Sequence, residues 1–262
     1  MSGEICYHLD SRGVATITID RPAVRNALDE ASHRELSALW DRIEADASVR
    51  VVVVTGAGDR AFCAGADVSD AGIGKTGLEY WSDGRPGGFG GLPLRRTLDV
   101  PVISRINGYA LGGGLELALG GDILVAAENA SLGFTEPRLG RVPLEGGAVL
   151  LARRLPHHLA MGMLMTGRKI TARQAYEWHL VNEVVPGDEL DAAVERWVSD
   201  MLACAPLSLK AIKSIVRDTA HLPPEQAQAL RLPALVAALN SKDQDEGVRA
   251  FAEKRAPQWE GR

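Results

Sequence analysis

The segment Ala110–Ala118 reads Ala-Leu-Gly-Gly-Gly-Leu-Glu-Leu-Ala, and the interpretation of the chain begins here. Three consecutive glycines allow the backbone to turn tightly and to expose its N–H groups. The apolar residues that follow predict the start of a buried helix, whose first N–H groups are unpaired and carry partial positive charge. Glu116 lies about one helical turn after Gly113. An anion-stabilising backbone and a carboxylate should therefore face the same small volume, as chemistry at a carbonyl group requires.

Two neighbouring segments add to this turn. Glu136 supplies a second carboxylate twenty residues after Glu116. The segment Ala61–Asp67 reads Ala-Phe-Cys-Ala-Gly-Ala-Asp, and its small residues allow a ligand to approach the backbone closely. Alone, each of these features has a plainer interpretation, such as a packed turn or a surface charge; their occurrence in this order favours a catalytic site.

Composition limits the class of protein. The chain has 262 residues, 46% hydrophobic and 24% charged, which is ordinary for one sizeable globular domain. A net charge of −5 argues against nucleic-acid binding, and no apolar run is long enough to span a membrane. The N-terminus lacks the pattern of a signal peptide, and the three cysteines, Cys6, Cys63 and Cys204, are widely spaced without a metal-binding pattern. We expect free thiols and a cytoplasmic location.

Strands are expected where β-branched or alternating apolar residues occur, and helices where apolar residues recur every three or four positions. The predicted strands are 14–19, 49–55, 101–106, 122–127 and 131–134. The predicted helices are one capped by Asp29, one starting at 112–116, and 146–153, 157–165, 171–178, 189–204, 206–219, 223–240 and 243–253. The Gly-rich segment 72–91 predicts a mobile loop or a short-helix insertion. Predicted strands alternate with predicted helices early in the chain, and only helices are predicted after residue 189. This order indicates an α/β core with a helical C-terminal part.

At this point the sequence resembles the crotonase (enoyl-CoA hydratase/isomerase) superfamily over nearly its whole length. The resemblance rests on the segments above and on 20–22, 26–28, 164–167, 181–185 and 251–255. The loop 87–92 and the tail 252–259 are most similar to the carnitinyl-CoA dehydratase branch. The resemblance implies a spiral of ββα units over residues 1–200. It also implies a helical region, 201–262, that mediates assembly of a homotrimer or of a hexamer made from two trimers.

The resemblance also implies roles for individual residues. The backbone N–H groups of Ala66 and Gly113 should form an oxyanion hole for the thioester oxygen, and Glu116 and Glu136 should be the catalytic acids. The substrate-contacting region corresponds to Arg25, Ala27, Ala64, Ala66, Asp67, Val68, Ser69 and Gly113. The implied reaction is addition or removal of water across the α,β double bond of an acyl-CoA. No metal or other cofactor is expected, because coenzyme A is part of the substrate.

One departure and two alternatives remain. Leu144 occupies the position of a glycine that helps to place the water in typical hydratases, and Glu145 adds a third acid, which we interpret as a helix-start charge. A double-bond isomerase is an alternative. Isomerases of this family can work with a single glutamate at the position of Glu136, so the presence of Glu116 speaks against this alternative. An RNA-binding role is disfavoured because the helix after Asp29 is acidic. Tyr80 and Trp81 are expected to pack, with a substrate contact as the lesser alternative.

Overall fold

Two β-sheets, joined by strand pairs that step from one to the other, form the core of the protein. The computed structural model describes residues 4–67 and 76–262. One sheet has six strands in the order β1-β2-β3-β5-β7-β10, and the other has four in the order β4-β6-β8-β9. The strands of the six-stranded sheet are β1 (Ile5–Leu9), β2 (Val14–Ile19), β3 (Val51–Gly56), β5 (Val102–Ile106), β7 (Ile123–Ala127) and β10 (Glu183–Val185). Those of the second sheet are β4 (Ala61–Cys63), β6 (Tyr109–Leu111), β8 (Ser131–Gly133) and β9 (Ile170–Thr171).

The order of the strands defines a spiral. The pairs β3 and β4, β5 and β6, and β7 and β8 each place their first strand in the large sheet and their second in the small one. Neighbours among β2, β3, β5, β7 and β10 are parallel, and only the β1–β2 pair of this sheet is antiparallel. The loops that follow β4, β6 and β8 of the small sheet therefore lie at the same edge of the molecule. The predicted α/β class and the spiral of ββα units are confirmed.

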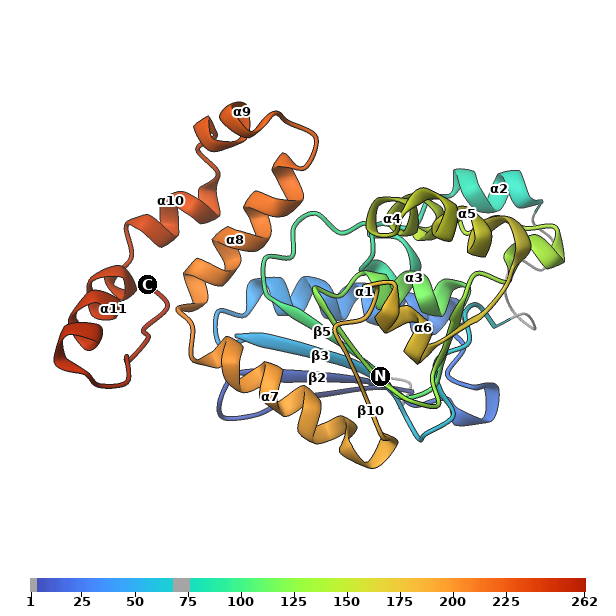
Figure 1. Ribbon diagram of the computed structural model, residues 1–262, viewed down its shortest axis with the longest axis horizontal. Helices are drawn as coiled ribbons and strands as arrows, with labels where there is room; N and C mark the ends of the chain where they lie inside the picture. Colours follow the sequence, from blue (N-terminus) through green and yellow to red (C-terminus); the bar gives the residue numbers. More distant parts are fainter. Residues whose placement is uncertain (1–3, 68–75) are drawn as a thin grey trace.

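Helices cover both faces of the large sheet (Figure 1). The helix α7 (Leu190–Leu202) packs on one face through a cluster of buried apolar side chains, and α1 (Glu30–Ala45) packs on the other. The first turn of α1 is capped by Asp29, whose carboxylate accepts the N–H of Ser32 at 2.8 Å, as predicted. The remaining helices near the small sheet are α2 (Gly77–Ser82), α3 (Gly113–Leu119), α4 (Gly147–Arg154), α5 (His157–Thr166) and α6 (Ala172–Glu177).

The last four helices extend to one side of the two sheets (Figure 1). They are α8 (Pro206–Thr219), α9 (Pro224–Ala229), α10 (Pro233–Leu239) and α11 (Lys242–Glu253). The predicted single helix over 223–240 is wrong, because the chain leaves helical geometry before Pro233. Leu232 has a ψ of 135°, since the ring of a following proline disfavours the helical conformation. Among the described residues, no helix is long and apolar enough to cross a membrane.

Most predicted strands and helices agree with the structure to within a few residues at their ends, but the predicted set was incomplete. It omitted β1, β4, β6, β9 and β10, of which all but β1 have only two or three residues, too few to show a clear alternation. The short helix α2 lies within the segment where a short-helix insertion was one of the two predictions.

Candidate active site

A sharp turn leads from β6 into α3 and fixes the centre of the site. Gly112 adopts φ 55° and ψ −127°, a conformation that L side chains rarely reach. A Cβ atom on Gly114 would lie 1.9 Å from the carbonyl oxygen of Cys63, on the neighbouring strand β4. The turn therefore requires glycine both for its backbone angles and for its close approach to β4.

The small-residue segment after β4 runs beside this turn. A Cβ atom on Gly65 would lie 3.3 Å from the backbone nitrogen of Gly113. The segment is held in place by Leu28, which donates its N–H to Gly65 at 2.9 Å and accepts the N–H of Asp67 at 2.8 Å. The backbone around Ala66 and the start of α3 are thus brought together, as the arrangement predicted for an oxyanion hole requires.

Glu116 is buried in α3, with an exposed fraction of 3%. Its Oε1 accepts the backbone N–H groups of Glu145 and Gly147 at 2.9 and 2.8 Å. Burial raises the pKa of Glu116 to about 8, and the negative charges of Glu145 and Glu136 act in the same direction, while the two backbone hydrogen bonds oppose them. This carboxyl group can therefore carry a proton near neutral pH.

Glu136 lies beside the same turn, close to Gly112. It begins a 3-10 helix, Glu136–Leu139, that follows β8, and β8 is tied to the turn by the N–H of Gly112, which bonds the carbonyl of Gly133 at 2.9 Å. A Cβ atom on Gly112 would lie 3.0 Å from Oε1 of Glu136. Burial raises the pKa of Glu136, and its Oε2 is buried without a hydrogen-bond partner among the described residues. The two predicted catalytic acids therefore converge on the Gly112 turn.

Most of the predicted substrate-contacting residues lie along the same strip of backbone. The carbonyl of Arg25, whose side chain is exposed, accepts the N–H of Ala64 at 3.1 Å. Ala27 is buried next to Leu28, and Asp67 is buried and paired with Arg21 at 3.4 Å. The pairing of Asp67 directs its carboxylate toward this arginine. Val68 and Ser69 lie outside the described residues.

Next to Glu116 the structure reveals a group of side chains that we name the polar cluster: Tyr80, Arg85 and Glu145. The hydroxyl of Tyr80 donates to Oε1 of Glu145 at 2.6 Å, and Arg85 donates to the same oxygen at 2.9 Å. Arg85 also donates to the Tyr80 hydroxyl at 2.7 Å. The sequence-based interpretation of Glu145 as a helix-start charge is thus incomplete. The residue lies just before α4, but its carboxylate binds side chains from the segment around α2.

Two further residues support the polar cluster from α1. Arg85 pairs with Glu30 at 2.8 Å, and one of its nitrogens lies 3.3 Å from Nε2 of His33. Nδ1 of His33 accepts the N–H of Gly90 at 3.1 Å. Burial, followed by the charge of Arg85, lowers the pKa of His33 to about 3, so this ring is neutral at physiological pH. Only the acidic character of Glu145 and its place beside the glycines of 146–147 could have pointed to this cluster from the sequence.

The part of the chain that the structure describes contains no group of three or more His, Cys, Asp or Glu side chains that could hold a metal ion. The site instead contains backbone N–H groups and two acids of raised pKa, the buried Glu116 and the partly buried Glu136. Such an arrangement is suited to stabilising a developing oxyanion and to moving protons at adjacent carbon atoms.

Fold and site together define the class of protein. Residues 10–262 match the family described as enoyl-CoA hydratase/isomerase. The chain belongs to this family, and the predicted superfamily and the predicted class of enzyme are confirmed.

Individual relatives cover almost the whole chain. It is 41% identical over 260 residues to the carnitinyl-CoA dehydratase of Proteus mirabilis strain HI4320, across 97% of this chain and 98% of that protein. Identity to the carnitinyl-CoA dehydratase of Escherichia coli K12 is also 41%, with the same coverage. Among solved structures, an enoyl-CoA hydratase from Bacillus anthracis superimposes with a TM-score of 0.90 at 33% identity, covering 99% of this chain and 100% of that one.

Proposed function

We propose that the protein adds water to, or removes water from, the α,β position of an acyl-CoA thioester at the Gly112 turn. The observation that carries the proposal is the convergence of Glu116 and Glu136 on this turn, beside the backbone of Gly113 and Ala66. No step requires a cofactor beyond the coenzyme A of the substrate. The raised pKa of Glu116 supports a role as proton donor.

In the direction of dehydration, the N–H groups of Ala66 and Gly113 bind the thioester oxygen as it gains enolate charge. The ionised carboxylate of Glu136 removes the proton from Cα. The protonated carboxyl of Glu116 gives its proton to the β-hydroxyl group as the C–O bond breaks, and water leaves. Hydration is the reverse, with Glu116 accepting a proton from water and Glu136 protonating Cα.

The acyl group that we propose is the carnitinyl or crotonobetainyl group, since both curated relatives described above are named carnitinyl-CoA dehydratases at 41% identity. Residues 64–69, with Arg25 and Ala27, are proposed to contact the coenzyme A part. The isomerase alternative is less favoured because the chain keeps a buried Glu116 in addition to Glu136.

We also propose a homotrimer, or a hexamer of two trimers, assembled through a helical region, 201–262, that follows a core of residues 1–200. Large apolar side chains exposed on α8, α10 and α11 support this assembly: Ile212, Val216, Leu239, Val248 and Phe251. Light scattering coupled to gel filtration would test it. A cytoplasmic location is proposed from the wide spacing of the three cysteines, Cys6, Cys63 and Cys204, which form no metal-binding sequence pattern.

The test of the activity is to mix the purified protein separately with crotonyl-CoA and crotonobetainyl-CoA and to follow the absorbance of the conjugated enoyl thioester. We expect loss of absorbance with the wild type. Glu116→Gln and Glu136→Gln should each slow it about 10²- to 10⁴-fold, the range for removal of a general acid or base. Turnover that persists in Glu116→Gln would indicate an isomerase, and no turnover of either substrate by the wild type would contradict the proposal.

A further inference from the structure

The polar cluster contains a carboxylate oxygen to which none of the residues 4–67 and 76–262 donates a hydrogen bond. Oε1 of Glu145 accepts hydrogen bonds from Tyr80 and Arg85, but Oε2 is buried and has no hydrogen-bond partner among the described residues. A buried carboxylate oxygen without a donor or a cation is costly, and such groups are normally paired in native proteins. A partner from outside the described chain would remove this cost.

The position of Glu145 places that oxygen beside the reacting groups. The backbone N–H of Glu145 binds Glu116, and its negative charge contributes to the raised pKa of Glu116. Tyr80 is also close enough for the charge of Glu116 to raise the pKa of its hydroxyl, after burial and Glu145. The polar cluster therefore borders the volume that a substrate occupies when its acyl carbons lie between Glu116 and Glu136.

Acidic side chains outnumber basic ones around this volume. Glu116, Glu136 and Glu145 are acids, and Arg85 is the one cation that pairs with any of them among the described residues. Arg85 is itself shared with Glu30. An acyl group that ends in a carboxylate would be repelled here, and a purely aliphatic one would leave Oε2 of Glu145 buried and unpaired. A cationic end would satisfy the oxygen and offset the negative charge.

We infer that Glu145, held in place by Tyr80 and Arg85, is a specificity-determining residue that recognises an alkylammonium group on the acyl chain of the substrate. The inference deepens the proposed function and rests on it for the position of the acyl group. The substrate class is thus an acyl-CoA with a positive charge beyond its β-carbon, rather than a straight-chain or an acidic acyl-CoA.

Binding of unreactive ligands tests this inference without relying on turnover. The two probes are the CoA thioester of 4-trimethylammoniobutanoate and its uncharged isostere, in which a tert-butyl group replaces the trimethylammonium group. Isothermal titration should show that the wild type binds the charged probe more tightly. Glu145→Gln should reduce that preference about 10- to 100-fold, the value of a charge-assisted contact.

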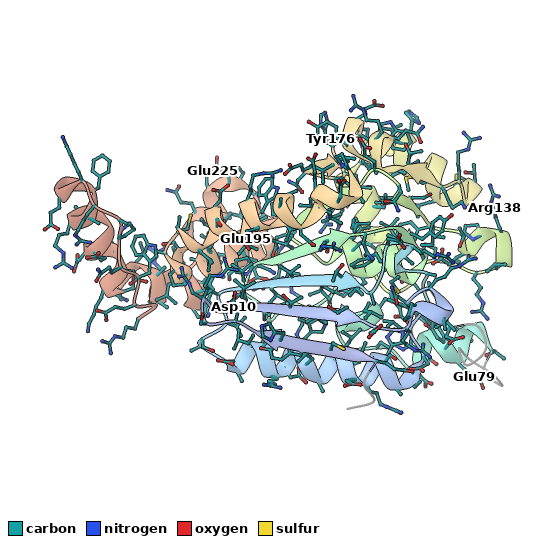
Figure 2. The ribbon with its side chains drawn as sticks, turned by 90° about the horizontal axis from the view of Figure 1, so that it is seen from below. Asp10, Glu79, Arg138, Tyr176, Glu195 and Glu225 are labelled. Carbon is teal, nitrogen blue, oxygen red and sulfur yellow. The ribbon has the colours of Figure 1, made fainter. Side chains whose placement is uncertain are left out.

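Two further variants serve as controls for the effect of Glu145→Gln. Glu145→Asp keeps the charge but shortens its reach, so it should retain part of the preference even if Glu145→Gln folds poorly. Glu225→Gln makes the same charge change on α9, far from α2, as the labels of Glu79 and Glu225 in Figure 2 show, and should leave the ratio unaltered.

Equal affinities of the wild type for the two probes would overturn the inference. So would an equal loss of both affinities in Glu145→Gln, which would indicate a structural role alone. If crotonobetainyl-CoA is not turned over but the charged probe is still preferred through Glu145, the inference stands and the proposed reaction fails.

Discussion

The Gly112 turn and the polar cluster are adjacent, but the carboxylates of Glu116 and Glu145 have different kinds of partner in the two regions. Glu116 is buried among apolar residues, accepts only backbone N–H groups, and pairs with no Arg or Lys side chain among the described residues, so its pKa rises. Glu145, in contrast, is held by the guanidinium of Arg85 and the hydroxyl of Tyr80. The acid that we propose to exchange a proton thus has no cation bound to it among the described residues, whereas the acid that we propose to recognise the substrate is paired with one.

The largest effect should come from breaking the turn. In Gly114→Ala the new Cβ would meet the carbonyl oxygen of Cys63, a backbone atom that cannot move aside easily. We expect a loss of about 3 kcal/mol in the free energy of unfolding, at the upper end for overpacking, measured by urea denaturation. The control is Gly162→Ala on α5, where a Cβ meets nothing within 4 Å and alanine should stabilise the helix slightly. Equal stabilities of the two variants would contradict this account of the turn.

Removal of the cation from the polar cluster should have the next largest effect. Arg85→Met leaves the carboxylate of Glu145 without its ion pair, and we expect a loss of about 2 kcal/mol in the free energy of unfolding. This is less than for a fully buried pair, because the side chain of Arg85 is 23% exposed. Arg173→Met, which breaks an exposed pair with Glu177, should cost less than about 0.5 kcal/mol. A similar small loss for both arginines would show that Glu145 does not depend on Arg85.

Tyr80→Phe should have a smaller effect, because it removes the two hydrogen bonds of the hydroxyl group, one to Glu145 and one from Arg85, but no charge. We expect a loss of about 1 kcal/mol in the free energy of unfolding, together with a modest weakening of the preference for a cationic probe. Thermal denaturation and the titration described above would measure the two effects. A loss as large as that in Arg85→Met would mean that the hydroxyl, and not the guanidinium, holds Glu145.

The smallest effect should appear in the pH dependence. In the direction of dehydration Glu116 must be protonated, so kcat/KM should fall as the pH rises through about 8. The negative charge of Glu145 raises the pKa of Glu116, so Glu145→Gln should move this fall to a lower pH. A midpoint that stays in place or moves upward would show that the two acids do not interact as the structure indicates.

The contrast between the two regions also explains what could be predicted from the sequence. The glycines, Glu116 and the apolar residues of the turn are contiguous, so local geometry alone indicated a tight turn into a buried helix. Glu136 and the Ala64–Asp67 segment follow in order, which allowed the family resemblance to assign them.

The polar cluster could not be predicted in this way. Tyr80 and Glu145 are 65 residues apart, and their contact depends on how α2 packs against the loop before α4. No periodicity or spacing encodes such a contact, so Glu145 was interpreted from its neighbours alone. The break at Pro233 was missed for a different reason: the apolar pattern of 223–240 continues across a proline that begins a new helix.

The most direct test of the account is a double-mutant cycle on Glu116 and Glu136, measured as kcat for loss of enoyl-thioester absorbance. If the two acids act as one unit on a single water molecule, the double variant Glu116→Gln, Glu136→Gln should be about as slow as the slower single variant. If the losses of the two single variants multiply in the double variant, the acids act independently, and the paired mechanism at the Gly112 turn is wrong.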